Sequence, residues 1–350
     1  MSDQRGDEVW RLANIGKGQD VRGSGGKGRP SLSAGAKARL ARIVAKRPEV
    51  MVRITGRTRG IVHLKAHLDY ISRNARLEVE RSDGVVIRDR HGMRVLHDDW
   101  LQANAVMARG RSSPQAVQSV SVILSMPPGN PPDKVQVAAR SWARDTFADQ
   151  HEWIMARHDD KGHPHVHVTV RAVGADGRRL TAGPKELQAW RERFARELRR
   201  YGVEAEATPR QARGLVRKGD GMAVHKIERR GAVPWVRQAA RRKAELEAKA
   251  LEPRPSQDWQ AAVERRQEGI RRAYLAHAAV LGASDDPADR QLRSDVERFV
   301  AGLPVATTRR HAVAAELRAV TDEGLHRRDT ITAAPPLASE PRQPYLRRRR

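Results

Sequence analysis

The sequence predicts an α/β sandwich of the α+β class, with a central, mostly antiparallel sheet and flanking helices. Short runs in which apolar and polar residues alternate indicate strands. Between them lie longer stretches with apolar residues every three or four positions, which is the spacing of amphipathic helices. The chain has 350 residues, enough for one such domain and an appended region.

The first half of the domain begins with a strand, because Val50 to Thr55 alternates between apolar and polar residues. Gly56 to Gly60 is a basic turn after it. Val62 to Arg73 is predicted as a helix from the spacing of its leucines and isoleucine. Leu77 to Ile87 is predicted as a hairpin with an Asp-Gly pair in its turn, and Val117 to Leu124 as the next strand.

The second half begins with a helix that Asn130, placed before two prolines, is expected to cap. Trp153 to His158 and Pro164 to Val173 are predicted as the central strands. Pro184 opens the next helix and Gly202 closes it, with a stripe of leucine and aromatic residues between them. Histidines are expected to line one face of the sheet, and helices to cover part of the other.

The chain is predicted to have four parts. Residues 1–48 form a basic, flexible N-terminal arm with a net charge of +7, and Ser31 to Lys46 within it is expected to be a basic helix. This arm either folds along nucleic acid or is a solvated tail. Residues 49–215 form the α/β domain, residues 216–333 a basic helical region, and residues 334–350 a disordered basic tail that ends in four arginines. Helices in the third part are expected at 239–247, 256–282 and 287–322.

The composition favours a polyanion as partner. Lys and Arg number 67 and Asp and Glu number 42, which gives a formal net charge of +25. This excess favours nucleic acid first and an anionic membrane surface second. The absence of cysteine excludes disulfides and thiolate zinc sites, and it fits a reducing cytoplasm. Because the sequence has no run of eighteen apolar residues and no signal-peptide core at its N-terminus, we expect no membrane insertion.

A histidine-rich stretch carries the clearest chemistry. His165 and His167 point to the same face of their predicted strand, where two imidazoles can hold one metal ion. His158 ends the preceding strand, and a hairpin would bring it beside them as a third ligand. His163 has the same parity as His165, so a ligand role stays open for it. The alternative is that these histidines are structural, but four histidines with Asp160 nearby favour a site.

This stretch resembles the third motif of conjugative relaxases of the MOB-P mobilization type, in the HUH endonuclease superfamily (the group of T-DNA border nickases). The motif reads His-x-Asp, three residues, and Pro-His-x-His, and it is complete here in His158, Asp160, Pro164, His165 and His167. The resemblance implies the HUH-type fold and a site- and strand-specific DNA nickase, in which a tyrosine attacks a phosphodiester and stays bound to the 5′ end.

Tyr70 is the predicted nucleophile. The string His67 to Arg73 resembles the first motif of these relaxases, in which a strand and a loop lead to a helix with the catalytic tyrosine. The chain has four tyrosines. Only Tyr70 precedes the histidine strand with basic residues around it. The alternative is an aromatic side chain packed on a helix face. The expected DNA contacts are Arg57, Arg59, Lys65, Arg73 and Arg210.

Three histidines add no negative charge, so a bound divalent cation would keep its charge for the phosphate. Imidazole ligands suit Mn or Zn, whereas the resemblance implies Mg or Mn. Asp160 is expected either to accept the proton of the tyrosine or to orient a ligand histidine, and we favour orientation.

The leading functional hypothesis is nicking and rejoining of DNA at the transfer origin of a plasmid or mobile element. The alternatives are a rolling-circle replication initiator or transposase of the same superfamily, and a non-catalytic DNA-binding accessory protein. The implied partners are single-stranded origin DNA, relaxosome accessory proteins and a type IV secretion coupling protein, for which Arg347 to Arg350 would be a signal. The implied location is the bacterial cytoplasm, with transfer into the recipient cell alongside the DNA.

Overall fold

A computed structural model of the chain describes residues 31–108, 115–148, 150–160, 162–210, 212–215, 221–248, 258–305 and 313. The chain divides into two compact units. The larger unit comprises residues 11–209 and 274–301, and the smaller one comprises residues 1–10, 210–273 and 302–350. Most of the predicted N-terminal arm, the C-terminal tail and the end of the last predicted helix lie outside the described residues.

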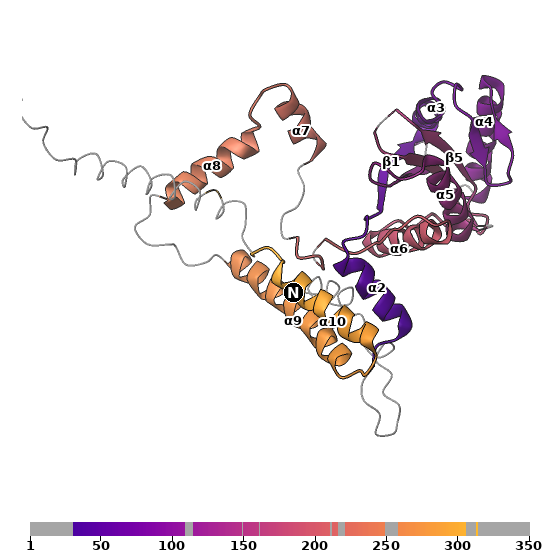
Figure 1. Ribbon diagram of the computed structural model, residues 1–350. Coiled ribbons are helices and arrows are strands. Elements are labelled where there is room, and N and C mark those ends of the chain that lie inside the picture. Colours follow the sequence, from indigo (N-terminus) through magenta and orange to yellow (C-terminus); the bar gives the residue numbers. More distant parts are fainter. Residues whose placement is uncertain are drawn as a thin grey trace, which may run out of the picture. The chain divides into compact units, whose positions relative to one another are not determined.

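A six-stranded sheet forms the centre of the larger unit (Figure 1). Its spatial order is β1-β4-β6-β5-β2-β3, and each neighbouring pair is antiparallel. The strands are β1 (Met51–Arg59), β2 (Val79–Arg81), β3 (Val86–Ile87), β4 (Val117–Ser125), β5 (Trp153–His158) and β6 (His165–Arg171). The predicted α+β fold with an antiparallel sheet is therefore confirmed.

Helices cover both faces of this sheet, where covering of only one face was expected (Figure 1). The helices α5 (Pro132–Phe147) and α6 (Pro184–Arg200) pack against the valine face of β6 and form the larger core. The helices α3 (Gly60–Ile71) and α4 (Arg90–Met107) pack against the other face. A buried Trp142 holds the larger core together, since its ring makes edge contacts with Phe147 and Trp190, at centroid distances of 5.4 and 6.0 Å.

Helix α4 was not predicted from the sequence. Its buried face includes Met93, Leu96 and Trp100, but it also includes His97 and Asn104. These two polar residues interrupt the apolar stripe. Each of them is buried because it has a hydrogen-bond partner: His97 Nε2 donates to the carbonyl of Ile61, and Asn104 donates to the carbonyl of Gln118.

The expected cap of α5 was wrong. The residue that precedes the helix is Pro131, and no side chain caps it. Asn130 instead donates to the carbonyl of Pro127, within the turn that leads to the helix. The proline pair at the helix start fixes the backbone angle without a side-chain cap.

Two helices outside the sheet complete the larger unit. They are α2 (Ala34–Val44), which Ser33 caps, and α10 (Pro287–Ala301). Lys37 of α2 forms an ion pair with the buried Asp289 of α10, at 2.6 Å. The long helix α9 (Asp258–Gly282) has residues in both units.

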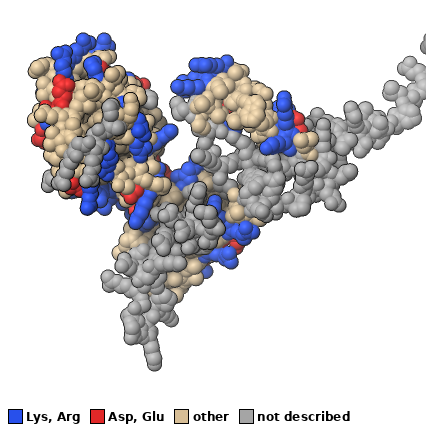
Figure 2. Space-filling model, turned by 180° about the vertical axis from the view of Figure 1, so that it is seen from behind, with Lys and Arg blue, Asp and Glu red and all other residues tan. Residues whose placement is uncertain are grey.

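The smaller unit contains α7 (Met222–Arg229) and α8 (Trp235–Ala248). The helix expected at 239–247 lies within α8, whereas α7 was not expected from the sequence. Lys and Arg gather in several groups on the face of the molecule shown in Figure 2, with fewer acidic side chains between them. Among the described residues, no helix combines the length and the apolar character needed to cross a lipid bilayer.

Candidate active site

Three histidines meet at one end of the sheet. His158 is the direct cross-strand partner of His165, and His167 follows two residues later on the same face of β6. Their imidazoles are buried, and one ligand atom from each lies within 4.8 Å of the others. The antiparallel pairing of β5 and β6 therefore produces the cluster that their spacing in the sequence predicts.

Hydrogen bonds to main-chain carbonyls orient two of these rings. His158 Nε2 donates to the carbonyl of Ile71, at 2.7 Å, and His165 Nδ1 donates to the carbonyl of His163, at 3.2 Å. Because a carbonyl oxygen can only accept, Nε2 of His158 carries the proton and a neutral ring leaves Nδ1 with a lone pair. That Nδ1 atom is buried without a hydrogen-bond partner in the described part of the chain.

The electrostatics keep the His158 ring neutral. Burial lowers its pKa, and the charge of Arg73 lowers it further, although the hydrogen bond to Ile71 acts in the opposite direction. A neutral imidazole with an unshared lone pair is the form that binds a metal ion. The donor set therefore fits a divalent cation held by His158, His165 and His167. His163 does not belong to this set; it contributes its carbonyl oxygen to His165.

Tyr70 lies beside this cluster, near the C-terminal end of α3. Its ring centroid is 6.2 Å from that of His158 and 6.0 Å from that of His167. The side chain is 51% exposed, whereas the neighbouring Leu68 and Ile71 are buried in the core. The exposure argues against the alternative of a tyrosine packed as a core aromatic, because its ring remains open to a ligand.

Arg73 and Asp160 border Tyr70. The guanidinium carbon of Arg73 lies 5.2 Å from the tyrosine ring centroid, and Arg73 Nη2 lies 2.5 Å from Asp160 Oδ2. Asp160 Oδ1 in turn lies 3.5 Å from Nε2 of His165. Burial raises the pKa of the Asp160 carboxyl group, but the charges of Arg73 and His165 outweigh it, so the pKa is lowered.

The backbone that carries Arg73 is strained. Arg73, Asn74 and Ala75 have φ values of 53°, 57° and 63°, in the left-handed region that residues other than glycine rarely adopt. The buried Ser72 supports this turn: its hydroxyl donates to the carbonyl of Leu68 and accepts a hydrogen bond from the amide of Ala75. The turn directs Arg73 back over Tyr70.

His67 also belongs to the site, because its ring centroid lies 6.4 Å from that of Tyr70. No role was predicted for it from the sequence. Its Nε2 lies 2.9 Å from Thr169 Oγ1 and 2.7 Å from Ser121 Oγ, two hydroxyls that are cross-strand partners on β6 and β4. Burial lowers the pKa of His67 to about 4. Its position one helical turn before Tyr70 was the available signal, since residues three apart share a helix face.

The other expected DNA contacts are dispersed. Arg59 is exposed at the start of α3, and Lys65 forms an ion pair with Asp69 along the helix. Arg57 donates to the carbonyl of Ala182 on the opposite face of the sheet. Arg210 belongs to the smaller unit.

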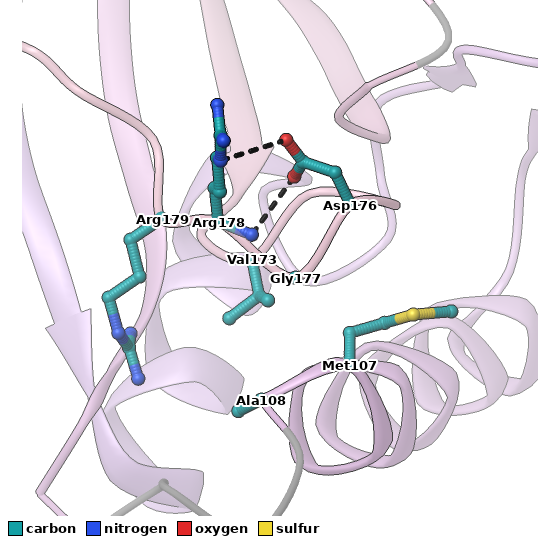
Figure 3. A pocket seen from close by; sticks show the side chains of 7 residues that line it. All are labelled: Met107, Ala108, Val173, Asp176, Gly177, Arg178 and Arg179. Carbon is teal, nitrogen blue, oxygen red and sulfur yellow. Dashed lines mark hydrogen bonds and ion pairs between the residues drawn. The ribbon is translucent and has the colours of Figure 1, made fainter.

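Two cavities lie near the ends of the strands. One cavity, of about 480 Å³, is lined by residues at the start of α5 and by Arg157, Asp159 and His163. It lies next to the histidine cluster. The other, of about 320 Å³, lies by the turn after β6 and the end of α4 (Figure 3). In Figure 3 the Asp176 carboxylate is turned toward Arg178, with which it forms a hydrogen bond and an ion pair. None of the residues that line this second cavity belongs to the histidine cluster.

Comparison with known proteins agrees with this geometry. Residues 70–203, from the tyrosine through the histidine strands to the end of α6, match the family of relaxases with a MobA/VirD2-like nuclease domain. This segment is similar to a relaxase nuclease domain. The resemblance of the two sequence motifs to the relaxases of the HUH group is thereby confirmed.

Individual relatives resemble the chain over the same domain. The T-DNA border endonuclease VirD2 of Rhizobium radiobacter is 27% identical over 198 residues, which cover 51% of this chain and 46% of the relative. VirD2 of Agrobacterium fabrum strain C58 is 27% identical over 190 residues, covering 49% of this chain and 42% of that protein. The chain thus matches less than half the length of these relatives, and the likeness concerns the relaxase domain.

Proposed function

We propose that this chain nicks and rejoins one strand of DNA at the transfer origin of a mobile element, with Tyr70 as the nucleophile. The observation that carries the proposal is the position of the exposed Tyr70 ring, about 6 Å from the rings of His158 and His167. The relaxase domain and the relatives named as DNA endonucleases support the same reaction.

In this reaction the oxygen of Tyr70 forms a bond to the phosphorus of the scissile phosphodiester, and the bond to the 3′ oxygen breaks. The tyrosine hydroxyl gives up its proton, and the leaving 3′ oxygen is protonated. The phosphotyrosyl ester preserves the energy of the broken bond, so the same residue can reseal the strand. A divalent cation, when bound by the three histidines, supplies positive charge to the non-bridging phosphate oxygens.

Asp160 acts in this proposal as an orienting group. Its lowered pKa makes the carboxylate a weak acceptor for a phenolic proton, whose own reference pKa is about 10. Its ion pair with Arg73 instead fixes that guanidinium beside the nucleophile. Its other carboxylate oxygen lies 3.5 Å from the ligand nitrogen of His165. Arg73 lies where it can bind the phosphate, and Arg59 and Lys65 supply further contacts to the DNA.

The ion is Mg or Mn in this proposal, with Zn as the alternative. The partners that follow from the relaxase assignment are single-stranded origin DNA, accessory proteins that expose it and a type IV secretion coupling protein. The protein then acts in the bacterial cytoplasm and accompanies the transferred strand.

A labelled origin oligonucleotide, incubated with Mn or Mg and resolved under denaturing conditions, tests the nucleophile. The wild-type chain should give a protein adduct on the 5′ end, and Tyr70→Phe should give none while binding DNA with nearly normal affinity. Tyr201→Phe is the matched control, because Tyr201 is half-buried against the main core and should leave the adduct intact. An adduct of normal yield in Tyr70→Phe would move the nucleophile elsewhere. Free cleaved ends from the wild-type chain would point to a hydrolase, and intact DNA to a binding protein.

A further inference from the structure

The edge strand β1 carries a bulge at Thr55. Arg53 pairs with Ile123 and Ile54 with Val122, but Gly56, two residues later, pairs with the next residue of β4, Ser121. Side chains of a regular strand alternate between faces, and one extra residue reverses the alternation beyond it. Residues on the two sides of Thr55 therefore follow opposite parities.

The bulge separates two arginines that a regular strand would place on one face. Arg53 has Ile123 as its partner, and Ile123 has His167 as its partner on the following strand, so these three residues form one row across the histidine face. Arg57 pairs with Val120, whose partner Val170 lies in the core beneath α5 and α6. The contact of Arg57 with the carbonyl of Ala182 agrees with this placement.

Two strand spacings separate Arg53 from His167, which is about 10 Å between backbones. The Arg53 side chain is exposed, and its guanidinium has no ion pair or hydrogen bond among the residues that the structure describes. Two other cations of the site have acidic partners: Arg73 pairs with Asp160, and Lys65 pairs with Asp69. Met51, which lies in the row of His165, is 44% exposed beside it. The histidine face of β1 is thus an open surface with an uncompensated guanidinium.

We propose that this surface, Met51 and Arg53 on β1, binds the single strand next to the scissile phosphate, with Arg53 on a phosphate oxygen. The inference rests on the proposed function, because that function makes single-stranded DNA the ligand. A guanidinium presents paired donors that match phosphate oxygens, and Met51 offers an apolar contact to a base or sugar. Contacts to phosphate position the strand without reading its sequence.

The test uses the full-length chain, a single-stranded oligonucleotide and binding titrations at several salt concentrations. Arg53→Gln should weaken binding about tenfold, which corresponds to the loss of one hydrogen bond to a charged group. It should also reduce the slope of log affinity against log salt by about 0.7, the value for one phosphate contact on a single strand. Arg53→Lys should retain the slope because it keeps the charge.

Arg144→Gln is the matched control, with the same charge change at an exposed arginine of α5, which covers the opposite face of the sheet. Its affinity and salt slope should stay close to those of the wild type. Equal weakening of DNA binding in the two glutamine variants would overturn the proposal, since the loss of affinity would then follow from the change in net charge alone. Unchanged binding in Arg53→Gln would overturn it as well. Because binding is measured without cleavage, a failure of the nicking proposal appears separately, as loss of the adduct from the wild-type chain.

Discussion

At the scale of single residues, the histidine cluster depends on which nitrogen of each ring carries the proton. Main-chain carbonyls decide this for two of the rings: Ile71 accepts from His158, and His163 accepts from His165. A carbonyl is a reliable partner for this purpose, because it cannot donate and so admits one tautomer. The ligand atoms are thereby prepared by the fold before any ion is present.

Removal of a ligand ring should therefore affect metal binding more than folding. His158→Ala, His165→Ala and His167→Ala should each lower the affinity for Mn, measured by calorimetry, by at least about tenfold, together with adduct yield. His91→Ala, an exposed histidine on α4, is the control and should change neither quantity. Unchanged Mn affinity in all three cluster variants would mean that the histidines are structural.

The sequence was sufficient to predict this cluster and the place of Tyr70, because both follow from short-range periodicity. His165 and His167 share a face in any regular strand, and Tyr70 falls on a helix whichever exact ends that helix has. The face of Arg57 could not be predicted in the same way, because the bulge at Thr55 depends on pairing with β4. The role of His67 depends likewise on hydroxyls more than fifty residues away.

At the scale of elements, α3 is fixed to its surroundings at three levels. Near its start the carbonyl of Ile61 accepts from His97, in its middle His67 contacts Thr169 and Ser121, and at its end the carbonyl of Ile71 accepts from His158. Its buried face packs on α4 and β5. These contacts determine where the tyrosine helix lies over the sheet, so the elements of the site are positioned by polar contacts as well as by the core.

The contact of His67 predicts a dependence of stability on pH. Its pKa in the folded protein is about 4, below the unfolded value of 6.5, so the unfolded chain binds more protons between these limits. The stabilisation by neutral His67 should be complete above pH 6.5 and decline as the pH falls toward 4, by at most about 3 kcal/mol. Denaturant unfolding at a series of pH values measures this decline.

His67→Gln should remove that part of the pH dependence, because glutamine can occupy the same hydroxyls without titrating. His63→Gln, one turn earlier and exposed on the same helix, should retain the dependence of the wild type. A slope that is identical in the wild type and in His67→Gln would assign the effect to other groups.

Helix α4 shows where periodicity is insufficient at this scale. Its buried face alternates apolar residues with His97 and Asn104, whose partners belong to α3 and β4. Met93, Leu96 and Trp100 keep helical spacing, but the apolar stripe is short, because polar residues with hydrogen bonds to other elements complete it. The sheet order, with β1 at one edge and β3 at the other, likewise follows from long-range pairing.

At the scale of the whole molecule, positive charge is concentrated outside the relaxase region. Residues 49–215 contain 28 Lys and Arg and 20 Asp and Glu, a net charge of +8 out of the total of +25. Residues 1–48 carry +7 and residues 216–350 carry +10. Most of the attraction to DNA should therefore come from the flanks, whose proposed division into an arm, a helical region and a tail remains a prediction.

Removal of residues 1–30 and 306–350, which leaves α2 and α10 in place, should weaken binding to DNA and flatten its salt dependence, because fewer counterions are released. Preference for the cognate origin over a scrambled oligonucleotide should persist, because lysine and arginine contacts to phosphate carry little base information. Titrations of both oligonucleotides at several salt concentrations measure the two effects. A truncated chain that no longer distinguishes them would show that the flanks read sequence.

The left-handed turn after α3 lowers the stability of the protein, but it holds Arg73 in place beside Tyr70. Arg73 and Ala75 each cost about 1–2 kcal/mol relative to an ordinary conformation, and Asn74 costs less, because asparagine adopts the left-handed conformation more readily. Glycine at position 74 or 75 would relieve part of that cost, but it would also let Arg73 swing away from Tyr70 and Asp160. Glycine here would thus raise the stability of the protein, but it would slow the proposed nicking reaction. The non-glycine residues at this turn agree with the proposed function, in which Arg73 has to stay beside Tyr70.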